Sequence, residues 1–382
     1  MGALPLAGLL VLSLEQAVAA PFTTRQLADL GARVIKVERA EGDFARRYDD
    51  SVFGQSSYFV WLNGGKQSVC LDLKAPADLA LVKRIAAHAD VFVQNLAPSA
   101  TERLGLSGPA LRATNSRLVT CSISGYGTGS TYDARKAYDL LIQCEAGLLS
   151  VTGTPEEPTK VGVSIADICA GMYAYSGVLS ALLVRERTGQ GSSVDVSMLD
   201  AMAEWMTQPY LLSRYSARQP GRTGARHASI APYGPFACGS GTVFLAVQNE
   251  REWTRLCALV LGDPGLVDNP LFATNPSRVT NEAALRAVVE QIFASSSAAE
   301  VGAQLEAASI ANAVLRGVTD LHLHPALQTR DRFRTVVTPE GAAELPRPPV
   351  LVNSAPAPAT IDVPALGADT AAIREEFCGE LG

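Results

Sequence analysis

Short runs of β-branched and apolar residues alternate with longer segments of helical pattern through the first 200 residues of this chain. Such alternation is typical of a parallel sheet whose strands are joined by crossover helices. Strands are expected at residues 9–14, 34–37, 68–73, 91–93, 118–123 and 193–196. The predicted fold class is therefore α/β, with a Rossmann-like large domain.

Helices are expected in the intervals between these strands. The hydroxyl of Thr23 or Thr24 can cap one that ends before Gly31, and Pro76 suits the first position of another. Residues 165–187 are rich in Ala, Leu and glycine, which is typical of a buried helix in close contact with neighbouring backbone. No window is expected to be apolar enough to cross a membrane, and the apolar start lacks the basic residues of a secretory signal.

The pattern changes beyond residue 200. Residues 1–200 are expected to form the N-terminal part of the large domain, and residues 201–224, which are rich in Arg, Pro and Gly towards their end, a linker. Residues 225–325 have the pattern of a smaller α+β domain. Residues 326–382 are expected to return to the large domain.

Charge and cysteine usage limit the partners. The chain of 382 residues has 32 basic and 38 acidic side chains, a net charge of −6, and only 18% charged residues. This balance argues against a nucleic-acid surface, although a few basic side chains can still hold a small anion. Seven scattered cysteines without a CxxC pair are typical of a reduced, cytoplasmic protein.

Asp167 lies at the start of the long helix expected at 165–187. The helix dipole there is expected to lower the pKa of its carboxyl and keep it ionised. Asp167 is then either an ordinary first-turn acid or a carboxylate nucleophile, with Ala166, Ala170 and Gly171 leaving room for a substrate. The local sequence does not choose between the two.

Several basic and amide side chains lie near the ends of the expected strands, where doubly wound sheets bind ligands. They are Arg39, Lys66, Asn95, Arg103 and Lys136. Each alone is an ordinary surface residue, but together they indicate a site for an anionic ligand.

Here the chain resembles the family III coenzyme A transferases and the related α-methylacyl-CoA racemases. The matching stretches include Asn63-Gly-Gly-Lys-Gln-Ser68, Lys136-Ala-Tyr-Asp139 and Ile165-Ala-Asp-Ile-Cys-Ala-Gly171. Further matches, in family order, are residues 30–39, 42–43, 94–98, 103–105, 124–127, 189–191 and 195–197.

The resemblance implies that Asp167 is the catalytic aspartate, which attacks an acyl-CoA thioester and passes through aspartyl–acyl anhydride and aspartyl-CoA intermediates. It also implies an interlocked homodimer of ring-like subunits and no metal or redox cofactor, since CoA itself is the carrier. The residues implied to contact CoA are Arg39, Lys66, Asn95, Leu96, Arg103 and Lys136.

Two departures bear on the substrate. Formyl-CoA transferases have a glycine-rich loop where this chain reads Gly224-Ala-Arg-His-Ala-Ser-Ile230. Arg226 or His227 is a candidate to bind a carboxylate of a C4–C5 dicarboxylic acid, and an interdomain salt bridge is the alternative. Racemases have a catalytic histidine where this chain has Tyr138, a poor base at neutral pH and a candidate substrate contact. A 2-methylacyl-CoA racemase and a non-catalytic acyl-CoA-binding protein remain as alternatives.

Overall fold

The computed structural model describes residues 4–97, 99–216, 220–352 and 358–378. Its internal contacts divide the chain into two compact units. The large unit comprises Met1–Ala146, Val161–Thr207 and Pro325–Gly382, and the small unit comprises Gly147–Lys160 and Gln208–His324. The small unit thus includes a segment from the first 200 residues. Residues 217–219 of the expected linker lie outside the described residues.

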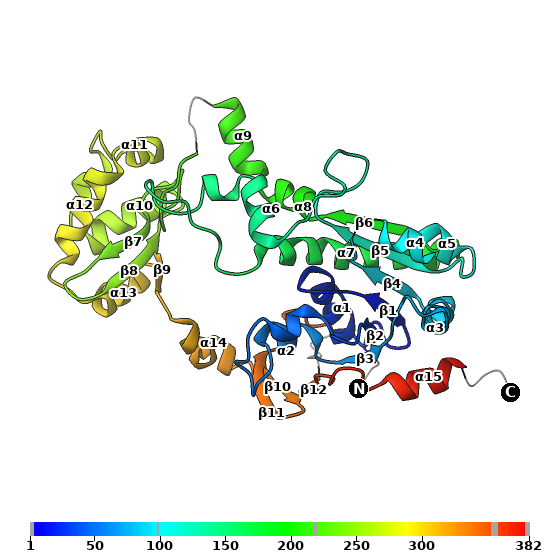
Figure 1. Ribbon diagram of the computed structural model, residues 1–382. Helices are drawn as coiled ribbons and strands as arrows, with labels where there is room; N and C mark the ends of the chain where they lie inside the picture. Colours follow the sequence, from blue (N-terminus) through cyan, green and yellow to red (C-terminus); the bar gives the residue numbers. More distant parts are fainter. Residues whose placement is uncertain (1–3, 98, 217–219, 353–357, 379–382) are drawn as a thin grey trace. The chain divides into compact units, whose positions relative to one another are not determined.

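A six-stranded sheet forms the centre of the large unit (Figure 1). Its strands are β1 (Leu10–Leu14), β2 (Arg33–Glu38), β3 (Lys66–Cys70), β4 (Val91–Gln94), β5 (Val119–Ser124) and β6 (Ser193–Ser197). They are ordered β3-β2-β1-β4-β5-β6, and every neighbouring pair is parallel. The predicted parallel α/β sheet is confirmed. The strand order reverses direction between β1 and β4, and open α/β sheets bind ligands at such a reversal.

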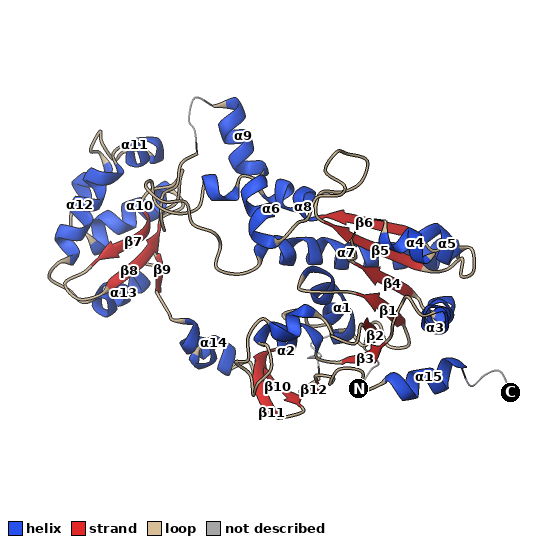
Figure 2. Cartoon of the chain, viewed as in Figure 1, coloured by secondary structure: helices blue, strands red, loops and turns tan. Residues whose placement is uncertain are grey.

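Helices cover both faces of this sheet (Figure 2). On one face α3 (Pro76–His88), α5 (Gly108–Arg112) and α15 (Thr370–Cys378) share an apolar core with the strands. On the other, α1 (Ala19–Asp29) packs against α7 (Ile165–Thr188), which also contacts β5 and β6. The predicted close approach at the α7 glycines is confirmed. A Cβ on Gly171 would lie 2.8 Å from the carbonyl oxygen of Ala19, and one on Gly177 2.6 Å from Val194.

Helix α1 begins earlier than its sequence suggests. Its N-cap is Val18, so the prediction of a threonine cap is wrong. The Thr23 hydroxyl instead donates to the carbonyl oxygen of Gly171 at 3.0 Å, and the Thr24 hydroxyl to Glu15 at 2.6 Å. A hydroxyl can be satisfied in a helix interior when it also bonds back to the preceding turn, as both do here.

Helix α7 corrects a second expectation. Among the described residues it is the one helix long and apolar enough to span a membrane by length and composition. Its packing against α1, β5, β6 and α8 (Met198–Trp205) explains part of that apolarity, because residues such as Ala174 and Val178 are buried there, whereas Leu183 and Val184 are exposed.

The remaining elements of the large unit lie around this sheet. A second sheet contains β10 (Phe333–Thr338), β11 (Gly341–Pro346) and β12 (Thr360–Asp362), and it packs against α2 (Ser57–Asn63). The short helices are η1 (Phe44–Arg47), α4 (Ala100–Leu104), α6 (Asp139–Glu145) and α14 (Pro325–Gln328). The second sheet is built from the C-terminal part of the chain, which returns to the large unit.

The small unit is α+β, with an antiparallel sheet ordered β7-β8-β9. Trp253, Val289 and Phe293 lie in its apolar core. Its strands are β7 (Tyr233–Ala237), β8 (Thr242–Ala246) and β9 (Ala311–Val314). Its helices are most of α9 (Thr207–Tyr215), η2 (Leu148–Ser150), α10 (Glu250–Arg255) with the π-helical turn η3 (Leu256–Val260), η4 (Pro264–Val267), α11 (Asn275–Thr280), α12 (Glu282–Phe293), α13 (Ala298–Ala307) and η5 (Val318–Leu323).

Candidate active site

Asp167 lies in the first turn of α7, as predicted. The residue at the N-cap position, Ser164, makes no capping hydrogen bond. Asp139, the first residue of α6, supplies one instead: its Oδ1 accepts from the backbone N–H of Ala166 at 2.8 Å and, at 3.4 Å, from that of Asp167. Two segments separated by 28 residues therefore meet at the start of this helix.

The surroundings of Asp167 raise its pKa to about 7. Burial is the main cause, and the charge of Asp139 adds to it. A backbone N–H of Ala19, in the first turn of α1, donates to the Asp167 carboxylate and acts in the opposite direction. The prediction of a lowered pKa is wrong, because desolvation and a like charge outweigh the helix dipole.

Tyrosines lie beside this carboxyl. Burial raises the pKa of Tyr48 to about 12, and the charges of Asp43 and Asp167 contribute. The rings of Tyr48 and Tyr58 pack edge to face with centroids 5.5 Å apart, and the Tyr58 hydroxyl lies 3.2 Å from the Ser164 hydroxyl. Tyr138 also raises the pKa of Tyr48, and its side chain is exposed. Tyr48 therefore keeps its proton and can donate a hydrogen bond.

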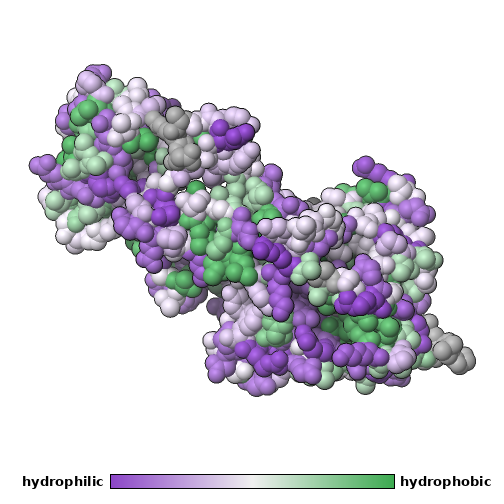
Figure 3. All heavy atoms as spheres, turned by 45° about the horizontal axis from the view of Figure 1, so that its top comes forward, coloured by the Kyte–Doolittle hydropathy of each residue, from purple (hydrophilic) through white to green (hydrophobic). Residues whose placement is uncertain are grey.

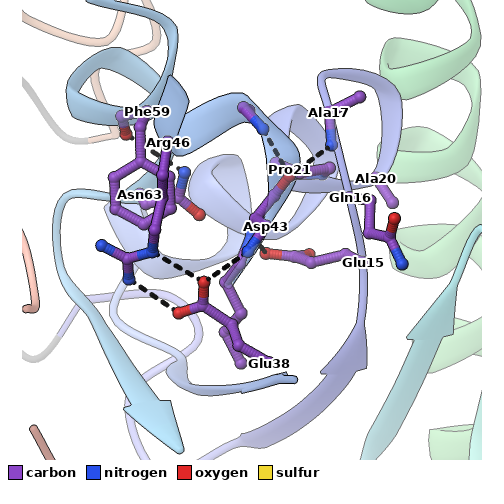
Figure 4. Close-up of polar contacts among 12 residues, drawn as sticks. Glu15, Gln16, Ala17, Ala20, Pro21, Glu38, Asp43, Arg46, Phe59 and Asn63 are labelled. Atoms are coloured by element: carbon purple, nitrogen blue, oxygen red, sulfur yellow. Dashed lines mark hydrogen bonds and ion pairs between the residues drawn. The ribbon is translucent and has the colours of Figure 1, made fainter. Parts of the chain in front are cut away.

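Beside β1 and β2, several charged side chains are buried together (Figure 4). Lys36 Nζ lies 2.7 Å from Asp43 Oδ2, and Lys66 Nζ lies 2.7 Å from Glu15 Oε1. Glu38 pairs with Arg46 at 2.7 Å. The side chains of both lysines, Glu15 and Asp43 are completely buried. We call these six residues the ion network.

The ion network holds the segment before α1. Asp43 Oδ1 accepts from the N–H of Ala17 at 3.1 Å, and Ala17 has a left-handed φ of 63°. From the other side, Asn95 Oδ1 accepts from the N–H of Gln16, and the Asn95 amide donates to the Gln16 carbonyl, both at 2.9 Å. The segment is therefore fixed from both sides just before the turn whose Ala19 N–H reaches Asp167.

A pocket of about 220 Å³ lies at the carboxyl ends of β1 to β4. Two predicted residues, Arg39 and Leu96, line it. Gln16 and Lys74 line it too and were missed, although Lys74 follows the expected third strand as Arg39 follows the second. The full lining, which we call the strand-end pocket, is Leu14, Glu15, Gln16, Val37, Glu38, Arg39, Gly42, Asp43, Leu71, Asp72, Leu73, Lys74 and Leu96.

Other predicted CoA contacts lie elsewhere in the large unit. Lys66 is enclosed, and its Nζ bonds to Glu15, Asn63 Oδ1 and the Pro21 carbonyl, so the structure assigns it to the ion network and not to a ligand. Asn95 positions Gln16, as described above. Arg103 is exposed and bonds to Ser99. Lys136 lines a separate open hollow of about 630 Å³ with Tyr126 and Arg135.

Arg226 and His227 belong to the small unit. Arg226 pairs with Glu282 at 2.6 Å, and because both residues lie in this unit, the alternative of an interdomain salt bridge is wrong. The His227 ring stacks on Tyr233 with centroids 5.1 Å apart and is exposed. Both side chains thus have partners within the small unit.

Known proteins resemble this chain over nearly its whole length. The model of CoA-transferase family III matches residues 6–370. The acetyl-CoA:oxalate CoA-transferase of Acetobacter aceti is 33% identical over 377 residues, 98% of this chain and 96% of the relative. The succinate–glutarate CoA-transferase of Agrobacterium fabrum is 31% identical over 384 residues, again 98% and 96%. A solved CAIB/BAIF family protein from Brucella suis, 33% identical, has a TM-score of 0.85 and is matched over 98% of this chain and 100% of that one.

The chain belongs to CoA-transferase family III, and it is an enzyme that transfers CoA. The resemblance drawn from the ordered motifs is thereby confirmed.

Proposed function

We propose that this enzyme moves CoA from an acyl-CoA donor to a C4–C5 dicarboxylate, with Asp167 as the covalent nucleophile. The observation that carries the proposal is the Asp167 carboxyl itself: it is half-buried, burial and the charge of Asp139 raise its pKa to about 7, and it accepts a hydrogen bond from the first turn of α1. A poorly solvated carboxylate of raised basicity is a better nucleophile than one in water.

The proposed reaction has four displacements. Asp167 attacks the thioester carbonyl, the C–S bond breaks, and a mixed anhydride and the CoA thiolate form. The thiolate then attacks the aspartyl carbonyl, which releases the donor acid and leaves an aspartyl-CoA thioester. The acceptor carboxylate displaces the thiolate to give a second anhydride, and the thiolate takes the acceptor's acyl group and regenerates Asp167. Every bond broken is replaced by another acyl bond, so the thioester's free energy is conserved if water is excluded.

The strand-end pocket suits the nucleotide part of CoA. Leu73 and Leu96 offer apolar surface for a base, and Arg39 and Lys74 offer cations for phosphates. Gln16, which accepts a hydrogen bond from Arg39 at 2.8 Å, connects this pocket to the segment that leads into α1. The proposed path of CoA therefore runs from the strand ends towards Asp167.

The substrate class is supported by the relatives, whose names specify oxalate, succinate and glutarate. The pKa of Tyr48 is raised to about 12, so its hydroxyl keeps its proton at neutral pH. This neutral group can donate a hydrogen bond to a substrate carboxylate beside Asp167. A cation there would instead lower the pKa of the nucleophile. Arg226 and His227 remain candidates to bind a substrate carboxylate.

The proposal includes a cytoplasmic location and an interlocked homodimer. All seven cysteines are free, which suits a reducing compartment. Apolar residues form patches on the face drawn in Figure 3, and large apolar side chains such as Leu183, Trp205 and Tyr215 are exposed, which suits burial against a second copy. Mass measurement of the native protein in solution tests the dimer, and a monomer at micromolar concentration contradicts it.

Hydroxylamine trapping tests the nucleophile. Incubation with succinyl-CoA and hydroxylamine is expected to convert the Asp167 carboxyl to a hydroxamate, located by peptide mass spectrometry, with loss of activity. Omission of succinyl-CoA and the Asp167→Asn variant are the controls. Transfer to glutarate, mesaconate or citramalate without any hydroxamate overturns covalent catalysis at Asp167. Rapid α-proton exchange of a 2-methylacyl-CoA in deuterated buffer without an acceptor acid favours the racemase instead.

A further inference from the structure

We infer that Asp139 is the positioning residue of this active site: its carboxylate orients the first turn of α7, which carries Asp167, and places a second negative charge beside the nucleophile. The inference rests on the proposed function, because it assigns Asp139 a part in acylation of Asp167.

The orienting contact comes from outside α7. Ser164 Oγ makes no capping bond and lies against the Tyr58 hydroxyl, so the N–H groups of Ala166 and Asp167 turn to Asp139 Oδ1. A side chain that accepts from the first turn of a helix fixes the backbone there. The direction in which the Asp167 carboxyl leaves that backbone is set with it.

Asp139 is itself held in place. Its Oδ2 accepts from Gln143 Nε2 at 2.6 Å, and the Gln143 side chain is buried. Gln143 Oε1 accepts from the N–H of Val161 at 3.0 Å, in the segment that leads into α7. The Asp139 and Gln143 pair thus ties α6 to the backbone of α7 and of its approach.

A neutral acceptor would satisfy the same N–H groups, so the charge needs its own explanation. Together with burial, the charge of Asp139 raises the pKa of Asp167 to about 7. Two neighbouring carboxylates repel each other, and acylation turns one of them into a neutral acyl group. The repulsion is therefore present before the first displacement and relieved after it, which favours the covalent intermediate.

Other ionisable groups lie on the elements around Asp167, but Asp139 is the charged group that raises its pKa. On α1, Arg25 and Asp29 pair with each other. Further ionisable groups on or beside these elements include Tyr48 after η1, Arg46 and Arg47 on η1, Tyr58 on α2, Tyr138 before α6, Cys144 and Glu145 on α6, Cys169, Tyr173 and Tyr175 on α7, Asp195 on β6, and Asp200 and Glu204 on α8.

The test is the pH dependence of transfer in Asp139→Asn, which keeps an acceptor oxygen and removes the charge. In the wild type, kcat is expected to rise through a midpoint near pH 7 as Asp167 ionises. In Asp139→Asn the midpoint is expected to fall by about one pH unit, with a plateau about tenfold lower. Asp139→Ala, which also removes the cap, is expected to lose about 10²-fold at every pH.

Asp133→Asn is the matched control, since Asp133 is an exposed-loop acid that also accepts backbone N–H bonds and lies six residues earlier. Its pH profile is expected to match the wild type. If Asp139→Asn does not fold by circular dichroism, Asp139→Ser, which retains a capping oxygen, takes its place. A folded variant with an unmoved midpoint overturns the role of Asp139, while wild-type hydroxamate at Asp167 still upholds the proposed function. Absence of that hydroxamate overturns the proposed function itself.

Discussion

In the large unit Glu15 is fully buried and Asp167 is half-buried, and the two acids meet opposite electrostatic surroundings. Burial alone would raise the pKa of Glu15, but the charges of Lys66 and Lys36 lower it. The pKa of Asp167 rises to about 7, because burial is joined by a second carboxylate and opposed only by a backbone N–H. The partner, and not the depth, decides the charge of a buried acid.

This difference in surroundings distinguishes acids that stabilise the fold from the acid that is proposed to react. Every acid of the ion network has a cation within ion-pair distance, so its charge is neutralised where it stands. Such acids stabilise a segment but are poor nucleophiles. Among the described residues, the groups that shift the pKa of Asp167 include no cation, and its charge remains available for bond formation.

The largest expected effect is loss of transfer in Asp167→Asn. The amide cannot form the anhydride, so kcat with any donor and acceptor pair is expected to fall by at least about 10⁴-fold. Acyl-CoA binding, measured by calorimetry, is expected to remain. Residual transfer above about 1% of the wild-type rate would mean that another residue is the nucleophile. Asp167 and Glu15 would then not differ in chemical role.

The next effect is on folding and comes from the ion network. Lys66→Met leaves Glu15 buried with Lys36 3.6 Å away and no other ion pair, and it is expected to cost about 3–5 kcal/mol of unfolding free energy. Urea unfolding measures it. Lys74→Met is the matched control, because Lys74 is exposed and the loss there is expected to be below about 0.5 kcal/mol. Equal losses in the two variants would show that burial of the pair is unimportant.

Asp167 is expected to weaken the fold as the pH rises. Its folded-state pKa of about 7 lies above its ordinary value of 3.8, so its ionisation costs stability as the pH rises from about 4 to 7. Asp167→Asn is therefore expected to be more stable than the wild type at pH 8, by about 1–3 kcal/mol, with the gain much smaller at pH 4. Thermal unfolding at both pH values checks this. A pH-independent difference would mean that the carboxyl is better solvated than its surroundings indicate.

The smallest effect concerns the strand-end pocket. Arg39→Ala and Lys74→Ala are each expected to raise the KM for acyl-CoA about tenfold with little change in kcat, because a hydrogen bond to a charged group contributes at least about 1.5 kcal/mol. Higher salt is expected to reduce the difference. Arg117→Ala, at an exposed pair with Glu186, is the control. A KM for the acceptor acid that rises instead would place the free acid, and not CoA, in this pocket.

Local pattern was sufficient for much of the fold. The expected ranges match all six parallel strands within about three residues, because most of these strands are buried on both faces and contain runs of apolar residues. The prediction that Thr23 or Thr24 caps the helix was wrong. A threonine hydroxyl can cap a helix or bond back to the preceding turn, and the packing of α1 against α7 determines which of the two occurs. The position of Asp167 at a helix start was likewise readable.

The electrostatics of the site were not readable, because they depend on distant segments. The helix dipole is visible beside Asp167 in the chain, whereas Asp139 lies 28 residues earlier and is brought there by α6. Lys66 and Lys74 differ in a simpler way: Lys66 begins β3 and its side chain is buried, while Lys74 lies beyond the carboxyl end of that strand. A search restricted to basic residues just beyond the carboxyl ends of the expected strands would have selected Lys74 and not Lys66.

The contact between Gly171 and the carbonyl of Ala19 has a consequence for protein engineering. Replacing a glycine inside a helix with alanine is a common way to raise thermal stability, since alanine favours the helix by about 1 kcal/mol. At position 171 the new methyl group would meet that carbonyl at 2.8 Å and the Phe22 ring at 3.0 Å. Because the N–H of Ala19 also donates to Asp167, a substitution that looks conservative on a helix wheel is expected to disturb the hydrogen bond of the proposed nucleophile.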